Sequence, residues 1–226
     1  MKWWAVPSRP DPVKALITFA AGARGTGKTA FVVQEIKRQR AKRLMLWDFK
    51  HDRRLMGVGC DVRTLPELAR MAGAATFKAR YLVDHGQDID RQFHWFCRIA
   101  WEAGCLLMFV DELPEVSKPG RAPPEWRKCV NVGREYRGAD GKEKWLSIMA
   151  AAQRPAECDK SVISNADVIH TGRLSFLDDA KYMAKTLGCK PEDLLNLPDL
   201  HWVEKKASER VHQTGILRFS TQKKAG

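Results

Sequence analysis

The sequence predicts an α/β fold in which a mostly parallel sheet is covered by helices on both faces. Apolar runs of strand length alternate with amphipathic stretches of helical length along most of the chain. The strand-like runs are almost continuously apolar, which is typical of parallel strands buried on both faces. At 226 residues the chain is long enough for one such domain with a sizeable core.

The order of the elements follows from the apolar pattern. Strands are expected at about 14–21, 43–49, 79–84, 105–111, 146–152 and 167–173, and helices near 27–40, 64–73, 89–103, 125–138 and 176–187. A short helix is expected after Pro191, followed by two runs, 200–204 and 215–219, that suit a terminal hairpin or edge strands. We therefore expect a single domain over 1–226, made of an N-terminal arm (1–13), a core (14–187) and a C-terminal helix and β-strand extension (188–226).

Residues 22–29 match the phosphate-binding pattern G-x-x-x-x-G-K-[ST], between the first expected strand and the first expected helix. Glycines allow consecutive backbone N–H groups to turn around phosphate oxygens, and the helix N-terminus favours negative charge. Lys28 is predicted to reach the β- and γ-phosphates, and the Thr29 hydroxyl to ligate Mg²⁺. The expected nucleotide-binding residues are Gly22, Ala23, Arg24, Gly25, Thr26, Gly27, Lys28 and Thr29.

Two further strand ends carry polar residues suited to hydrolysis. The run 105–110 ends in Asp111 and Glu112, where an aspartate of a P-loop NTPase holds Mg²⁺ and a following glutamate can polarise the attacking water. The run 146–152 ends in Gln153, an uncharged side chain suited to sensing the γ-phosphate. The Asp111–Glu112 pair favours hydrolysis over transfer of the phosphoryl group to another substrate.

Charge points to a polyanionic partner. The formal net charge is +12, and basic residues gather after the first expected helix, at 51–54 and near the C-terminus. An excess of this size makes nucleic acid the leading partner. The histidines and cysteines show no metal-binding spacing, and no apolar run is long enough to span a bilayer or to form a signal peptide.

Four segments together resemble the FtsK/HerA superfamily of DNA-pumping ATPases. The phosphate loop and the Asp111–Glu112 strand are shared with many P-loop families. The run 44–50 resembles the superfamily's apolar strand ending in Asp-x-Lys, and Gly133-Arg134 followed by Gln153-Arg154-Pro155 resembles its Gly-Arg helix end and later Gln-Arg-Pro. The resemblance covers about residues 14–187, and the chain's size is closest to the minimal genome-packaging ATPases of tailless, internal-membrane bacteriophages.

The resemblance implies a RecA-like P-loop fold, with ATP and Mg²⁺ as cofactors. It implies a homo-oligomeric ring, expected to be a hexamer, that hydrolyses ATP to move double-stranded DNA into a capsid. In such rings a neighbouring subunit supplies an arginine, and Arg134 is the first choice here, followed by Arg137 and Arg154. The polar insertion 138–144 makes the alignment of the first two uncertain. The expected partners are a capsid vertex or membrane-associated packaging proteins, and the expected location is the host cytoplasm or the packaging vertex of the virion.

Other functions stay open on the sequence. An assembly or export ATPase of the zonula-occludens-toxin type shares the P-loop, the Asp-Glu strand and a late glutamine, although such proteins normally continue into a transmembrane helix. Plasmid or chromosome translocases also remain. A nucleotide-dependent switch or a small-molecule kinase is a further alternative. The basic stretch 121–127 could be mistaken for the lid that a kinase needs, but the Asp111–Glu112 pair argues against a kinase. The proline-rich stretch 113–124, directly after Glu112, is expected to be a loop near the nucleotide or the DNA path.

Overall fold

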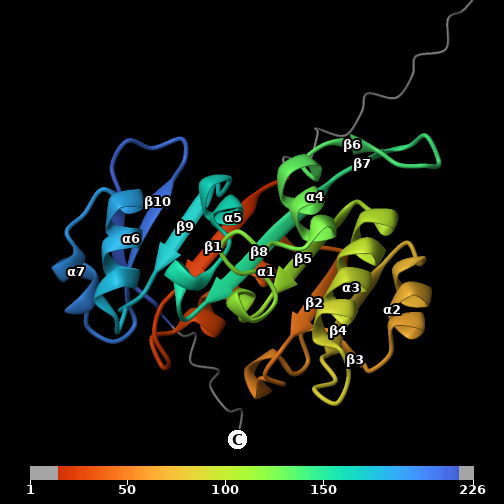
Figure 1. Cartoon of the computed structure of the whole chain (residues 1–226), viewed down its shortest axis with the longest axis horizontal. Coiled ribbons are helices and arrows are strands. Elements are labelled where there is room, and N and C mark those ends of the chain that lie inside the picture. Colours follow the sequence, from red (N-terminus) through yellow and green to blue (C-terminus); the bar gives the residue numbers. More distant parts are fainter. Residues whose placement is uncertain (1–14, 219–226) are drawn as a thin grey trace, which may run out of the picture.

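The computed structural model describes residues 15–218, so the expected N-terminal arm and the last residues of the chain lie outside the described part. A nine-stranded sheet has the order β11-β10-β9-β1-β8-β5-β2-β4-β3. From β9 to β3 every neighbouring pair of strands is parallel, whereas β10 and β11 are antiparallel additions at one edge. The predicted fold class, including the C-terminal edge strands, is confirmed (Figure 1).

The element bounds agree closely with the apolar pattern. The strands of the large sheet are β1 (Ile17–Ala21), β2 (Arg43–Asp48), β3 (Cys60–Val62), β4 (Phe77–Leu82), β5 (Leu106–Val110), β8 (Leu146–Ala152), β9 (Val168–Thr171), β10 (His201–Lys206) and β11 (Gln213–Ile216). The α-helices are α1 (Lys28–Gln39), α2 (Leu65–Ala72), α3 (Ile89–Ala103), α4 (Pro124–Val132), α5 (Lys160–Ser164), α6 (Leu177–Leu187) and α7 (Pro191–Leu195).

Each face of the sheet has its own hydrophobic core. Alternate residues of each strand point to opposite faces, so Phe19 and Trp47 belong to the larger core and Leu46 and Phe109 to the smaller one. Helices α2 to α6 contribute to the larger core, whereas the smaller core is packed against α1. Figure 1 looks onto the face that α3, α4 and α5 cover. This two-sided burial explains why the central strands are apolar at nearly every position.

The helix predicted over 125–138 is too long. Helix α4 ends at Val132, and a Cβ on Gly133 would lie 2.2 Å from the carbonyl oxygen of Cys129. The chain then forms a small antiparallel hairpin of β6 (Tyr136–Arg137) and β7 (Glu143–Lys144), fixed where the ring of Tyr136 stacks on Trp101 at 3.8 Å. The polar insertion is therefore the tip of a hairpin that projects from the body (Figure 1).

The C-terminal extension belongs to the same sheet and reaches the phosphate loop. Strand β10 pairs with β9, and the second predicted run forms β11 slightly earlier than expected, at Gln213–Ile216. Leu217 is buried, and its backbone N–H donates to the carbonyl oxygen of Leu200. Phe219, the last residue of that predicted run, lies outside the described residues. Across residues 15–218, no helix has both the length and the apolar character needed to cross a membrane.

Candidate nucleotide-hydrolysis site

The phosphate loop follows β1 and leads directly into α1. Gly22 and Gly27 adopt φ angles of 150° and 99°, which side-chain-bearing residues rarely reach. A Cβ on Gly22 would lie 2.6 Å from Oγ1 of Thr26, and one on Gly27 would lie 2.9 Å from Leu217. Both glycines are therefore required by the shape of the loop and by its neighbours.

Lys28 lies folded over its own loop. Its Nζ donates to the carbonyl oxygens of Gly22 at 2.5 Å and Ala23 at 3.1 Å. Burial lowers the pKa of Lys28 to about 8, against the opposing effect of the nearby carboxylates Glu112 and Asp111. A partly buried ammonium that is hydrogen-bonded to neutral carbonyls is well placed to bind an anionic group.

The two carboxylates at the end of β5 have different environments. Asp111 is 9% exposed, and burial, together with the charges of Glu112 and Asp48, raises its pKa to about 7. Glu112 is also buried and has a left-handed backbone, with φ 48° and ψ 57°. Glutamate rarely adopts this conformation, which here turns the chain from the end of β5 into the short 3₁₀ helix that follows.

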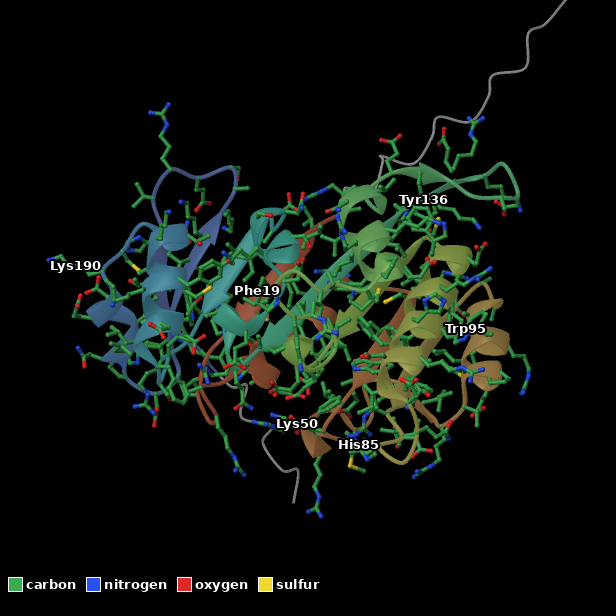
Figure 2. The ribbon with its side chains drawn as sticks, viewed as in Figure 1. Phe19, Lys50, His85, Trp95, Tyr136 and Lys190 are labelled. Atoms are coloured by element: carbon green, nitrogen blue, oxygen red, sulfur yellow. The ribbon has the colours of Figure 1, made fainter. Side chains whose placement is uncertain are left out.

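Glu112 is the meeting point of three strand ends. Gln153, directly after β8, donates from Nε2 to Oε1 of Glu112 at 2.8 Å. Lys50, just beyond the end of β2, donates from Nζ to the same oxygen at 2.8 Å. Strands β1, β8, β5 and β2 are consecutive in the sheet, so their carboxyl ends bring these groups to the edge that holds the phosphate loop. Figure 2 places Lys50 at this edge.

A second group of charges shapes the rim of the site. The hydroxyl of Thr29 donates to Oδ2 of Asp52 at 3.1 Å, and Asp52 also pairs with Arg54 at 2.8 Å. Arg80 is almost fully buried and pairs with Asp48 at 2.7 Å. Its Nη2 donates to the carbonyl oxygen of Asp52. This buried ion pair fixes the segment after β2 against β4, so Asp52 and Thr29 stay close.

One pocket contains most of the residues expected to act together. It is lined by Ala23, Arg24, Gly25, Gly27, Lys28, Thr29, Lys50, Asp52, Arg54, Asp111, Glu112 and Gln153. The structure thus brings together the phosphate loop, the two β5 carboxylates and the β8 glutamine. Lys50, Asp52 and Arg54 also line the pocket, although no site role was predicted for them from the sequence. Lys50 was visible within the Asp-x-Lys strand end, whereas nothing in the spacing marks Asp52 or Arg54.

Arg134 is not brought to this pocket within the same chain. Its guanidinium donates to Asp167 at 2.6 Å and to the carbonyl oxygens of Asn165 and Ala15. These partners precede β9 and β1, so Arg134 lies at the amino ends of the strands, opposite the phosphate loop. Arg154 lies nearer the site, but it pairs with Asp179 at 2.6 Å and lies over the ring of Phe176.

Comparison with known proteins agrees with this geometry. No protein-family model matches the sequence. Protein P9 of Pseudoalteromonas phage PM2 is 25% identical over 197 residues, which is 85% of this chain and 84% of that protein.

Solved structures match over nearly the whole chain. The genome packaging NTPase B204 of Sulfolobus turreted icosahedral virus 2, in complex with AMPPCP, superposes with a TM-score of 0.69 at 14% identity. The match covers 91% of this chain and all of that one. The bacterial conjugative coupling protein TrwBdeltaN70 superposes with a TM-score of 0.57 at 11% identity, over 89% of this chain and 84% of that one. The resemblance predicted from the motifs is confirmed at the level of the fold: this chain is similar in sequence to a phage protein, and it shares its fold with a viral genome packaging NTPase and a conjugative coupling protein.

Proposed function

We propose that this chain is an ATPase that uses hydrolysis to move double-stranded DNA, as the motor of a viral genome-packaging machine. The observation that carries the proposal is the convergence of Lys28, Glu112 and Gln153 on one pocket beside the phosphate loop. The similarity of the chain's fold to that of a viral genome packaging NTPase and the chain's net charge of +12 support DNA as the cargo.

The residues of the pocket have distinct roles in the proposed reaction. The backbone N–H groups of residues 22–29 would bind the phosphates, and Lys28 would neutralise charge on the β- and γ-phosphates. Glu112 would accept a hydrogen bond from the attacking water and orient it toward the γ-phosphorus. Gln153, which already contacts Glu112, would link the state of the γ-phosphate to that carboxylate.

The oxygen donors near the loop fit Mg²⁺. Asp111 is a carboxylate buried at some cost to its ionised form, and a hard divalent cation prefers oxygen ligands of this kind. Asp111 and the Thr29 hydroxyl would hold the ion, which would supply neutralisation of phosphate charge.

The turn after Glu112 is the proposed DNA-contacting element. A short 3₁₀ helix, η2 (Leu113–Glu115), leads from Glu112 to Ser117, whose carbonyl oxygen accepts from the N–H of Asp159. The following turn presents Lys118 and Arg121 on the surface, joined by an antiparallel bridge. Only η2 and the two residues after it separate Glu112 from Lys118, so a change at Glu112 would be passed to two exposed cations.

The proposal includes an assembly of several copies of the chain. We propose a homo-oligomeric ring, with a hexamer as the expected form, that docks on a capsid vertex or on membrane-associated packaging proteins. Packaging would take place in the host cytoplasm, and the ring could remain in the virion at the packaging vertex.

The direct test is the ATPase rate with and without linear duplex DNA. We expect DNA to raise the rate in the wild-type protein, and Lys28→Ala to abolish hydrolysis under both conditions. A rate that is indifferent to DNA over a range of salt concentrations would refute a DNA motor. Transfer of labelled γ-phosphate to a small acceptor, in place of release as free phosphate, would instead identify a kinase.

A further inference from the structure

We infer that Lys50 is a positioning residue that holds Glu112 in the nucleotide-free protein and moves to the γ-phosphate when a triphosphate binds. The inference rests on the proposed nucleotide site and deepens it, because it adds Lys50 to Gln153 as a group that links Glu112 to the γ-phosphate. Lys50 would thereby distinguish ATP from ADP.

The backbone on both sides of Lys50 is fixed. Nε2 of His85 lies 2.8 Å from the carbonyl oxygen of Phe49, and Nε2 of His51 lies 2.8 Å from that of Val83. The ring of Phe49 also packs edge-on against that of His85. The segment after β2 is thus held against the segment after β4, so motion at Lys50 is confined to its side chain. Figure 2 shows Lys50 and His85 close to each other at the pocket edge of the sheet.

The Lys50 side chain is free enough to change partners, whereas the Glu112 side chain is not. The side chain of Lys50 is 47% exposed and that of Glu112 is 9% exposed. Lys50 and Gln153 both donate to Oε1 of Glu112 at 2.8 Å. Because both donors, one charged and one neutral, use the same oxygen, they set the orientation of the Glu112 carboxylate and hold it toward Lys50 and Gln153.

A bound triphosphate would compete for Lys50 directly. Lys50 and Lys28 line the same pocket, and Lys28 already covers the phosphate loop. The γ-phosphate carries more negative charge than a carboxylate and offers three acceptor oxygens, so it is the stronger partner for an ammonium group. Departure of Lys50 would leave Glu112 with Gln153 alone, which frees the carboxylate for water only when a γ-phosphate is present.

The first test compares the binding of ATPγS and ADP, each with Mg²⁺, by titration calorimetry. Lys50→Ala is expected to weaken ATPγS about 10- to 100-fold, the range for a hydrogen bond between charged groups, while ADP changes much less. The matched control is Lys206→Ala, which removes a lysine at the end of β10 that pairs with Glu209. It should leave both affinities unchanged. Equal losses for the two nucleotides, or no loss, would overturn the inference.

The second test is a double-mutant cycle with Glu112→Gln. Removing the carboxylate frees Lys50 in advance, so ATPγS should bind more tightly to Glu112→Gln than to the wild type. In the Lys50→Ala background the same substitution should give a clearly smaller gain, because only charge repulsion is then relieved. The same gain in both backgrounds would show that Lys50 does not exchange partners.

Failure of this inference is separable from failure of the proposed function. Lys28→Ala should lose both ATPγS and ADP, since it acts on the phosphate loop itself. If Lys28→Ala behaves so and Lys50→Ala leaves the ATPγS-to-ADP ratio unchanged, the nucleotide site stands and the Lys50 exchange is wrong. If Lys28→Ala binds both nucleotides normally, the nucleotide site itself is wrong.

Discussion

The burial of Asp111 lowers the free energy of unfolding at neutral pH. The pKa of its buried carboxyl is raised to about 7, from an ordinary value of 3.8. An aspartate with a raised folded-state pKa costs stability as the pH rises from about 4, where the unfolded chain ionises, to about 7, where the folded chain ionises. The cost should then stay constant above pH 7. The buried charge is useful only where a cation or a triphosphate complex meets it.

The prediction is that Asp111→Asn stabilises the nucleotide-free protein in a pH-dependent way. With about 1.4 kcal/mol for each pKa unit, the gain in unfolding free energy should approach about 2–4 kcal/mol at pH 8. At pH 4, where the wild-type carboxyl is protonated in the folded protein, the gain should be close to zero. Urea unfolding in EDTA across this range measures it, and a gain that is the same at both pH values would refute the account of Asp111.

The candidate site could be predicted largely because it consists of short motifs at strand ends. Lys28, Thr29, Asp111, Glu112 and Gln153 each follow a recognisable apolar run or lie in the phosphate loop. The contact of Lys50 with Glu112 could not be predicted, because it depends on β2 lying beside β5 in the sheet. Sheet order is a long-range property that local patterns do not contain.

The same limit explains the differences at the level of helices and strands. The long strands and helices were predicted in the right order from periodicity. Strand β3 has three residues and α5 has five, too few for a period to show. The end of α4 was misplaced because the contacts that hold the chain beyond it are tertiary: the N–H of Leu146 donates to the carbonyl oxygen of Gly133, and Tyr136 stacks on Trp101. The buried Arg80–Asp48 pair likewise needs the register of β2 against β4.

The turn of residues 118–121 gives a prediction about DNA contact. Replacing both Lys118 and Arg121 by alanine should weaken binding to a DNA duplex, because two exposed cations in the turn that follows Glu112 are lost. The dependence of log Kd on log salt should also flatten by about 1–2, since fewer phosphates are neutralised. Fluorescence anisotropy of a labelled duplex at several salt concentrations measures both effects.

The matched control removes the same charge from another surface. Lys181 and Lys185 lie exposed on α6, and their double alanine variant should bind the duplex with an almost unchanged salt slope. If the two double variants lose affinity equally, binding depends on the overall charge of the protein and not on this turn.

The proposed ring provides the test of Arg134. This arginine lies at the opposite edge of the sheet from the phosphate loop of its own chain, so it could serve only a neighbour's nucleotide. If Arg134 acts as an arginine finger between subunits, mixing Arg134→Ala with Lys28→Ala protein is expected to restore part of the ATPase activity. No rescue at any mixing ratio, with Arg134→Ala itself fully active, would leave only its observed role of joining the starts of β1 and β9.

If ATP hydrolysis at this site moves the protein along DNA, the protein should displace a third strand from linear duplex DNA. The protein would be added with ATP and Mg²⁺ to a duplex that carries a labelled triplex-forming oligonucleotide near one end. We expect ATP-dependent release of the oligonucleotide by the wild-type protein, and none by Lys28→Ala or Glu112→Gln, which keep the basic surface. Release that does not require ATP, or hydrolysis that DNA stimulates without any release, would contradict a motor that moves along duplex DNA.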